Sequence, residues 1–197
     1  MQFENATDFI LNKLAIELPD HLYYHSSAHT HDVYAAAKLL IGMEQIDIYP
    51  KQLILTAACY HDAGYLTHTL GHEEESCRIA KEVLIDFNYS LAEIDIICGM
   101  IRATRIPQSP QTHLEQILAD ADLDYLGRDD FFAISHKLYL ELLHLGIIKD
   151  EADWNMVQIG FIESHRYFTK TAINLREDKK QSNLEKIKAR IHKTAFR

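Results

Sequence analysis

Apolar side chains recur every three or four residues along most of this chain, which is the spacing of helices with one buried face. The first such segment runs from about Phe3 to Leu18 and ends at Pro19. We expect later helices at about residues 28–40, 50–62, 72–83, 91–102, 111–122, 129–145, 151–175 and 176–196. Only 7 glycines and 4 prolines interrupt the 197 residues, which favours long helices over a sheet. The sequence therefore predicts an all-α fold.

The clearest interruption of the helical pattern is the segment 106–110, which contains two prolines. It separates two helices but does not have the composition of a linker between domains. The chain contains no internal repeat and no low-complexity segment, and its length is enough to bury one substantial core. We therefore expect residues 1–197 to form a single domain.

Several of the expected helices carry a histidine or an aspartate at one end of the apolar face. His61 follows Ala57 by one helical turn, so it continues an inward-facing row of side chains, and Asp62 comes directly after it. A buried imidazole beside a carboxylate needs a partner, because leaving both groups unsatisfied is costly. A metal ion can bind both groups at once. The helical spacing predicts the same inward position for His29, His72 and Asp122.

A histidine–aspartate doublet taken alone has a simpler interpretation. It is more often a core histidine bonded to a backbone carbonyl beside a solvated helix end. Similarly, Glu73, Glu74 and Glu75 open a helix, where the helix dipole favours carboxylates, so we expect at least two of them to serve the helix end. The set His29, His61, Asp62 and Asp122 is what favours a metal site over this interpretation.

Two imidazoles and two carboxylates suit a divalent ion such as manganese, iron, cobalt, nickel, zinc or magnesium, with coordination positions left for water. Such an ion lowers the pKa of a bound water from roughly 15.7 toward about 7, so that hydroxide is available at neutral pH. Hydrolysis of an activated bond is the natural use of this chemistry.

The charge and the cysteines limit the function classes. A formal net charge of -9 disfavours nonspecific binding to nucleic acid or to an anionic membrane, although a small phosphate ligand is compatible with it.

Cys59, Cys77 and Cys98 lie far apart within apolar helical patterns, as expected of core residues in a reducing compartment. The chain shows no leader pattern and no apolar run of membrane length. We expect a cytoplasmic protein that binds neither nucleic acid nor membranes.

The order of histidine, histidine–aspartate and aspartate across the helices resembles the HD superfamily of metal-dependent phosphohydrolases, and most of all its small, uncharacterised bacterial members. The matching segments are residues 24–33, 61–65, 72–76 and 120–127. The resemblance implies an HD-domain-like helical bundle, with a metal-binding core at residues 20–130 and additional C-terminal helices at 131–197 packed on that core. It also implies that the metal ligands are His29, His61, Asp62 and Asp122.

The segment 25–33 also looks like the corresponding segment of cyclic-nucleotide phosphodiesterases. Carried over, His25 is a general acid that protonates the leaving oxygen. Ser26 stands where those enzymes have asparagine, and their additional downstream histidine and asparagine are missing after Asp62.

The resemblance assigns the position of His72 either to a second metal or to substrate phosphate, with Glu73 beside it. Members with two metals carry a further histidine near the end of the following helix, where this chain has Arg102 and Arg105. We therefore expect one divalent metal ion, with a second one left open. The two arginines are candidates to bind phosphate through paired N–H groups, although a surface role is an equal alternative.

The resulting hypothesis is an enzyme, a metal-dependent phosphohydrolase of the phosphomonoesterase or phosphodiesterase type. It would hydrolyse a small phosphate ester, a nucleotide or related signalling molecule, with a metal-activated water and with His25 and Asp62 as catalytic residues. The expected partner is a small phosphorylated substrate, and a homodimer is left open. Two alternatives remain, an HD-type di-iron oxygenase and a non-catalytic module that binds metal or nucleotide.

Overall fold

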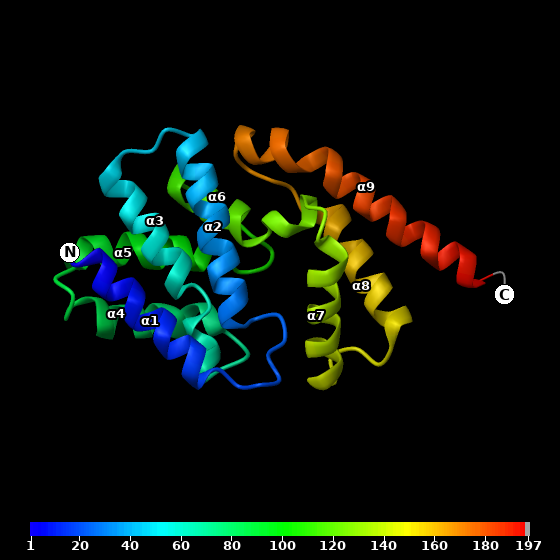
Figure 1. The fold of residues 1–197 in the computed structure, drawn as a ribbon, viewed down its shortest axis with the longest axis horizontal. Coiled ribbons are helices and arrows are strands. Elements are labelled where there is room, and N and C mark those ends of the chain that lie inside the picture. The colour runs from blue at the N-terminus through cyan, green and yellow to red at the C-terminus, as the bar shows by residue number, and fades with distance from the viewer. Residues whose placement is uncertain (196–197) are drawn as a thin grey trace. The chain divides into compact units, whose positions relative to one another are not determined.

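The computed structural model describes residues 1–195, and every regular element in that range is a helix (Figure 1). The prediction of an all-α fold is therefore confirmed. The predicted end of the last helix at Phe196 lies outside the described residues. The α-helices are α1 (Phe3–Glu17), α2 (Ser27–Met43), α3 (Ile48–Tyr60), α4 (His72–Leu84), α5 (Leu91–Ala103), α6 (His113–Asp122), α7 (Phe131–His144), α8 (Glu151–Ser164) and α9 (Lys170–Ala195), and two 3₁₀ turns are η1 (Ala63–Leu66) and η2 (Asp124–Gly127).

The chain divides into two compact units, Met1–Leu123 and Asp124–Arg197, which we call the N-terminal unit and the C-terminal unit. The N-terminal unit contains α1 to α6 with η1, and the C-terminal unit contains η2 with α7 to α9. The expectation of one domain, with the C-terminal helices packed on the metal-binding core, stays a prediction.

The core of the N-terminal unit is built around α3. All residues from Leu53 to Tyr60 are buried, so this helix has no solvated face along its C-terminal half. It packs against α1, α2, α5 and α6 (Figure 1). Because α3 ends inside the unit, the residues that follow Tyr60 begin in the protein interior.

Two helices of this unit start with reciprocal capping bonds. The predicted capping box at Ser90 and Glu93 is confirmed, since each side chain bonds the backbone N–H of the other residue. Thr112 and Glu115 form a second capping box, which starts α6. The second box fixes the start of the helix that ends at Asp122.

The prediction of one helix over 151–175 and another over 176–196 was wrong in its placement of the break. α8 ends at Ser164, and α9 begins at Lys170. His165 has an extended backbone, and Thr169 Oγ1 accepts a hydrogen bond from Ala172 N, which starts a new helix. The buried Lys180 Nζ also donates to the His165 carbonyl. Helical spacing of apolar residues continues through this segment in the sequence and therefore conceals the break.

Asp124 forms a buried ion pair with Arg176 in the C-terminal unit. Its side chain is almost fully buried and accepts hydrogen bonds from Arg176 Nε at 2.6 Å and Nη2 at 3.1 Å. Asp124→Asn should lower the free energy of unfolding by about 2 kcal/mol, because it leaves the Arg176 charge without its carboxylate in a largely buried place. The matched control is Asp129→Asn, which removes the ion pair of a 94% exposed carboxylate with Lys179 and should cost much less, because solvent screens that pair. Equal losses in urea denaturation would contradict this account.

Candidate metal centre

Three helices of the N-terminal unit bring the four predicted ligands together. Ser26 is the N-cap residue of α2, so His29 lies in the first turn. His61 and Asp62 directly follow α3, and Asp122 is the last residue of α6. Helix α2 packs against both α3 and α6 (Figure 1). The side chains at these helix ends meet, as their distances show.

The side chains of His29, His61 and Asp122 form one group of potential ligands, and Asp62 lies beside the two histidines. His29 Nε2 lies 3.2 Å from Asp122 Oδ1 and 3.5 Å from Asp62 Oδ2. His61 Nε2 lies 3.1 Å from Asp62 Oδ2 and 3.5 Å from Asp122 Oδ1. The donor atoms of His29, His61 and Asp122 all lie within 4.8 Å of one another. We refer to these four residues as the ligand cluster.

The backbone fixes which nitrogen of His61 faces the cluster. His61 Nδ1 lies 2.8 Å from the Ala58 carbonyl oxygen, which can only accept, so Nδ1 carries the proton in this bond. In the neutral ring, Nε2 is then an acceptor that points at the carboxylates. A histidine that donates one N–H to a carbonyl in this way is the usual arrangement in metal sites.

The ligand cluster fits a bound cation. His61 Nε2 and Asp62 Oδ2 are fully buried and have no hydrogen-bond partner among the described residues, although they lie 3.1 Å apart. Two acceptors that face each other in the interior are unfavourable unless a positive charge lies between them. Either a proton or a metal ion satisfies both atoms. The donor set of two imidazoles and two carboxylates suits a divalent metal.

The electrostatics of the cluster also favour a positive charge. Burial lowers the pKa of His61, but the Asp62 and Asp122 carboxylates outweigh burial and raise this pKa well above its usual value. Burial alone raises the pKa of Asp122, yet the hydrogen bond with His29 and the nearby His61 imidazole lower this pKa to about 2. The pKa of Asp62 is lowered as well, because His61 outweighs burial there. Without a metal, the cluster therefore holds a proton tightly.

This proton gives a prediction about stability and pH in protein stripped of metal. Because the folded-state pKa of His61 is raised, its contribution is fully present below pH 6.5 and is lost as the pH rises through the folded-state value. The free energy of unfolding should fall as the pH rises above 6.5 and through the folded-state pKa of His61, with a limiting slope of about 1.4 kcal/mol per pH unit. Urea denaturation in EDTA measures this slope. His61→Gln should remove most of the slope, and a wild-type protein whose stability does not change in this range would contradict the assignment.

His72 lies on the other side of Asp62. Its Nε2 is 3.4 Å from Asp62 Oδ1 and 3.8 Å from Glu73 Oε1. Burial lowers the pKa of His72 and outweighs the two carboxylates, which act in the opposite direction. His72 and Glu73 therefore border the ligand cluster as a second pair of possible metal or phosphate contacts.

The two arginines are paired with carboxylates of α4. Arg102 Nε donates to both Glu74 oxygens at 3.0 and 3.1 Å, and Arg105 Nη2 donates to Glu74 Oε1 at 3.3 Å. Arg105 Nε also lies 3.6 Å from Glu73 Oε2. Arg105 is thus linked through Glu73 to His72 and the ligand cluster. Arg102, in contrast, is paired with the partly exposed Glu74.

His25 lies next to the ligand cluster, where its ring is close to those of two histidines. Its ring centroid is 6.1 Å from that of His29 and 6.0 Å from that of His72. Its Nε2 is 3.1 Å from the hydroxyl oxygen of Tyr65. No pattern in the sequence assigned a role to Tyr65, and its signal was its place three residues after Asp62, at the end of the segment 61–65.

A hydrogen-bonded link holds the histidine–aspartate turn against α4. Ser76 Oγ donates to the His61 carbonyl at 2.7 Å and accepts from Gly64 N at 2.8 Å. Ser76 is fully buried, and its inward position agrees with the helical spacing in the sequence. This link fixes the backbone on both sides of Asp62.

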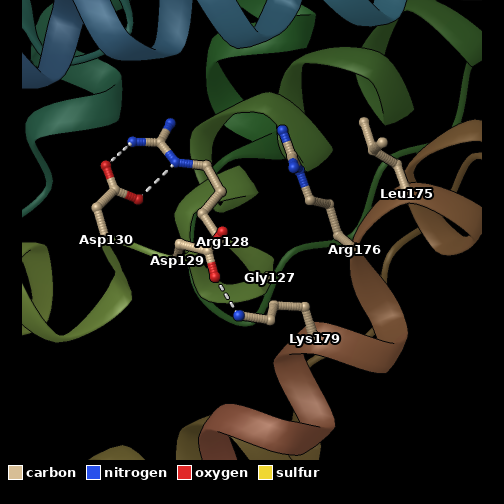
Figure 2. Close-up of a pocket in the computed structure, with 7 residues that line it drawn as sticks. All are labelled: Gly127, Arg128, Asp129, Asp130, Leu175, Arg176 and Lys179. Atoms are coloured by element: carbon tan, nitrogen blue, oxygen red, sulfur yellow. Dashed lines mark hydrogen bonds and ion pairs between the residues drawn. The ribbon is translucent and has the colours of Figure 1, made fainter.

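A separate open depression of about 500 Å³ lies in the C-terminal unit (Figure 2). Its charged groups pair with each other or with neighbouring carboxylates: Arg128 with Asp130, Lys179 with Asp129, and Arg176 with Asp124. The cations are thus balanced by carboxylates of the same unit. None of the predicted site residues lines this depression, which is lined by Gly127, Arg128, Asp129, Asp130, Leu175, Arg176 and Lys179.

Comparison with known proteins agrees with this architecture. The family model of the HD domain matches residues 13–124, and the chain therefore belongs to the HD domain family. No protein of curated function matches the chain. No helix within the described residues is long and apolar enough to cross a membrane.

Two solved structures share the fold. A predicted HD superfamily hydrolase from an uncultured Thermotogales bacterium matches with a TM-score of 0.64 and 18% identity, covering 96% of this chain and 91% of that one. A protein from Lactobacillus plantarum matches with a TM-score of 0.69 and 17% identity, covering 98% of this chain and 99% of that one. At these identities the likeness establishes the fold alone.

Proposed function

We propose that this chain is a metal-dependent phosphohydrolase that acts on a small phosphate ester, a nucleotide or a related signalling molecule. The observation that carries the proposal is the pair of buried acceptors, His61 Nε2 and Asp62 Oδ2, which face each other inside a cluster of metal-ligating groups. Membership of the HD domain family and the likeness to the Thermotogales protein, a predicted HD superfamily hydrolase, support the same class of reaction.

The ligand cluster, His29, His61, Asp62 and Asp122, would hold one divalent ion. When bound, such an ion lowers the pKa of water toward about 7 and offsets negative charge on the phosphoryl oxygens. Asp62 directs one oxygen toward His61 and the other toward His72, so it orients both histidines in addition to binding the ion. A second ion would use His72 and Glu73.

Two residues outside the ligand cluster serve the substrate in this proposal. His25 protonates the leaving oxygen, since it lies next to His29 and His72 without belonging to the ligand cluster. Arg105 receives the phosphate, because its guanidinium is already linked to the site through Glu73. Arg102 shares Glu74 with Arg105 and helps to hold that guanidinium in place.

The remaining parts of the proposal concern surroundings and partners. The three cysteines are free and buried, which supports a cytoplasmic location. The net charge of -9 supports a small phosphorylated substrate over nucleic acid or a membrane surface. A homodimer is part of the proposal and is tested by the mass of the purified protein in solution.

The test is phosphate release from a panel of nucleotide monoesters, cyclic nucleotides and other diesters, each with added manganese, cobalt, zinc or magnesium. We expect metal-dependent release from at least one substrate class, and the class identifies monoester or diester cleavage. Two bound irons, an optical signal that changes under oxygen and no phosphate release would contradict the proposal and favour the di-iron oxygenase. Nucleotide binding that requires metal but proceeds without hydrolysis would favour a binding module.

A further inference from the structure

Tyr65 forms a hydrogen-bonded and stacked contact with His25. Its hydroxyl oxygen lies 3.1 Å from His25 Nε2, and the two rings are stacked with centroids 4.2 Å apart and an interplanar angle of 22°. The Tyr65 ring also stacks on His72, with centroids 4.2 Å apart and an angle of 26°. Tyr65 therefore touches a histidine on each of two segments that border the ligand cluster.

The His25 ring is held from a second side as well. Tyr24 meets it edge to face, with centroids 4.8 Å apart and an angle of 87°. Tyr24 also lies against the ring of His29, with centroids 4.5 Å apart. Tyr24 and Tyr65 are both buried, so the rings that contact His25 belong to the packed core. In this arrangement the Tyr65 hydroxyl supplies a directional contact that ring packing alone does not provide.

The position of Tyr65 is tied to that of Asp62. Tyr65 N donates to the Asp62 carbonyl at 3.1 Å, and both residues belong to the turn that continues into η1. Gly64 lies between them, and its N–H donates a hydrogen bond to Ser76 Oγ, which in turn donates to the His61 carbonyl. A change in the place of Tyr65 would therefore require a change in the turn that carries two ligands of the cluster.

We propose that Tyr65 is a positioning residue, which orients His25 relative to the ligand cluster for protonation of the leaving oxygen. This inference rests on the proposed phosphohydrolase function. The proton passes from His25 to the oxygen of the breaking P–O bond, which takes the bonding electron pair. The oxygen of water forms the new P–O bond, the proton that water loses goes to solvent, and His25 regains a proton from solvent. Tyr65 acts only through His25, so its hydroxyl matters when the leaving group needs that proton.

The kinetic test compares Tyr65→Phe on two esters of the same phosphate type. An alkyl ester needs its leaving oxygen protonated, whereas a para-nitrophenyl ester does not, because nitrophenolate is a stable anion. Tyr65→Phe keeps the ring and should lower kcat for the alkyl ester by about tenfold to a hundredfold, with KM and the nitrophenyl reaction nearly unchanged. In a His25→Gln background the same substitution should cause no further loss.

The matched control is Tyr89→Phe. It also removes a buried tyrosine hydroxyl of the N-terminal unit, one bonded to Thr56 Oγ1 at 2.8 Å, and should leave both reactions unchanged. Equal losses on the two esters in Tyr65→Phe, or losses that add to those of His25→Gln, would overturn the inference, since a merely structural role produces that result.

A second readout does not depend on activity. Side-chain nitrogen NMR of the protein with magnesium should show the His25 resonances, identified by their absence in His25→Gln. Tyr65→Phe should shift the Nε2 resonance, and Tyr89→Phe should leave it in place. An unchanged resonance in Tyr65→Phe would overturn the inference. If the wild type hydrolyses no ester at all, the proposed function fails, and the positioning role of Tyr65 in that reaction is overturned with it, whether or not the NMR shift is seen.

Discussion

Asp62→Ala is expected to reduce metal-dependent hydrolysis on the order of a thousandfold or more and to lower the metal content of the purified protein. The reason is the number of groups that meet at this carboxylate. One oxygen lies 3.1 Å from His61 Nε2 and 3.5 Å from His29 Nε2, and the other lies 3.4 Å from His72 Nε2. Steady-state kinetics together with elemental analysis of the same samples measure both effects.

The control for this substitution is Asp95→Ala, which removes an exposed carboxylate of α5 in the same unit. It should keep wild-type activity and metal content. Circular dichroism should show the same helix content in both variants, so that a loss in Asp62→Ala is not a loss of fold. Full activity of Asp62→Ala would contradict the assignment of Asp62 to the metal site.

Gly64→Ala is expected to destabilise the protein by about 3 kcal/mol or more and to displace the histidine–aspartate turn. A Cβ atom at this position would lie 2.0 Å from the His72 carbonyl oxygen and 2.7 Å from its carbonyl carbon. Because these are backbone atoms, relief requires movement of η1 away from the start of α4. That movement also breaks the bond from Gly64 N to Ser76 Oγ, so we expect loss of activity with loss of stability.

Gly42→Ala is the matched control for a glycine-to-alanine change. Gly42 lies within α2, and a Cβ there would meet nothing within 4 Å. The substitution should raise the free energy of unfolding by about 0.5 to 1 kcal/mol, because alanine is the better helix former. Urea denaturation distinguishes the two variants directly. Equal stability of Gly64→Ala and the wild type would contradict the close approach of η1 and α4.

Much of the fold could be predicted from the sequence because helical spacing is a local signal. The apolar row that ends at His61 predicts an inward histidine, and the structure places it in the interior after the fully buried part of α3. The same reasoning placed His29 and Asp122 at helix ends. The break between Ser164 and Lys170 could not be found in this way, because the apolar spacing runs through it while the Thr169 cap and the buried Lys180 determine the backbone.

The contacts that complete the candidate site depend on tertiary packing and leave little trace in a periodic pattern. Tyr65 meets His25 only because η1 folds back beside the segment before α2. The pairing of Arg102 and Arg105 with Glu74 joins α4 to α5 and the segment after it, across 28 and 31 residues of sequence respectively. Gly64 is a local signal of this packing, since a glycine two residues after Asp62 permits a close approach of another backbone segment.

The most direct test of the central claim is a titration of a divalent ion into EDTA-treated protein, with bound metal and phosphate release measured in the same samples. The account predicts that release rises in proportion to bound metal and reaches its maximum at about one ion per chain. Phosphate release that is independent of bound metal would contradict it, and so would a fully loaded protein that releases no phosphate from any ester of the panel.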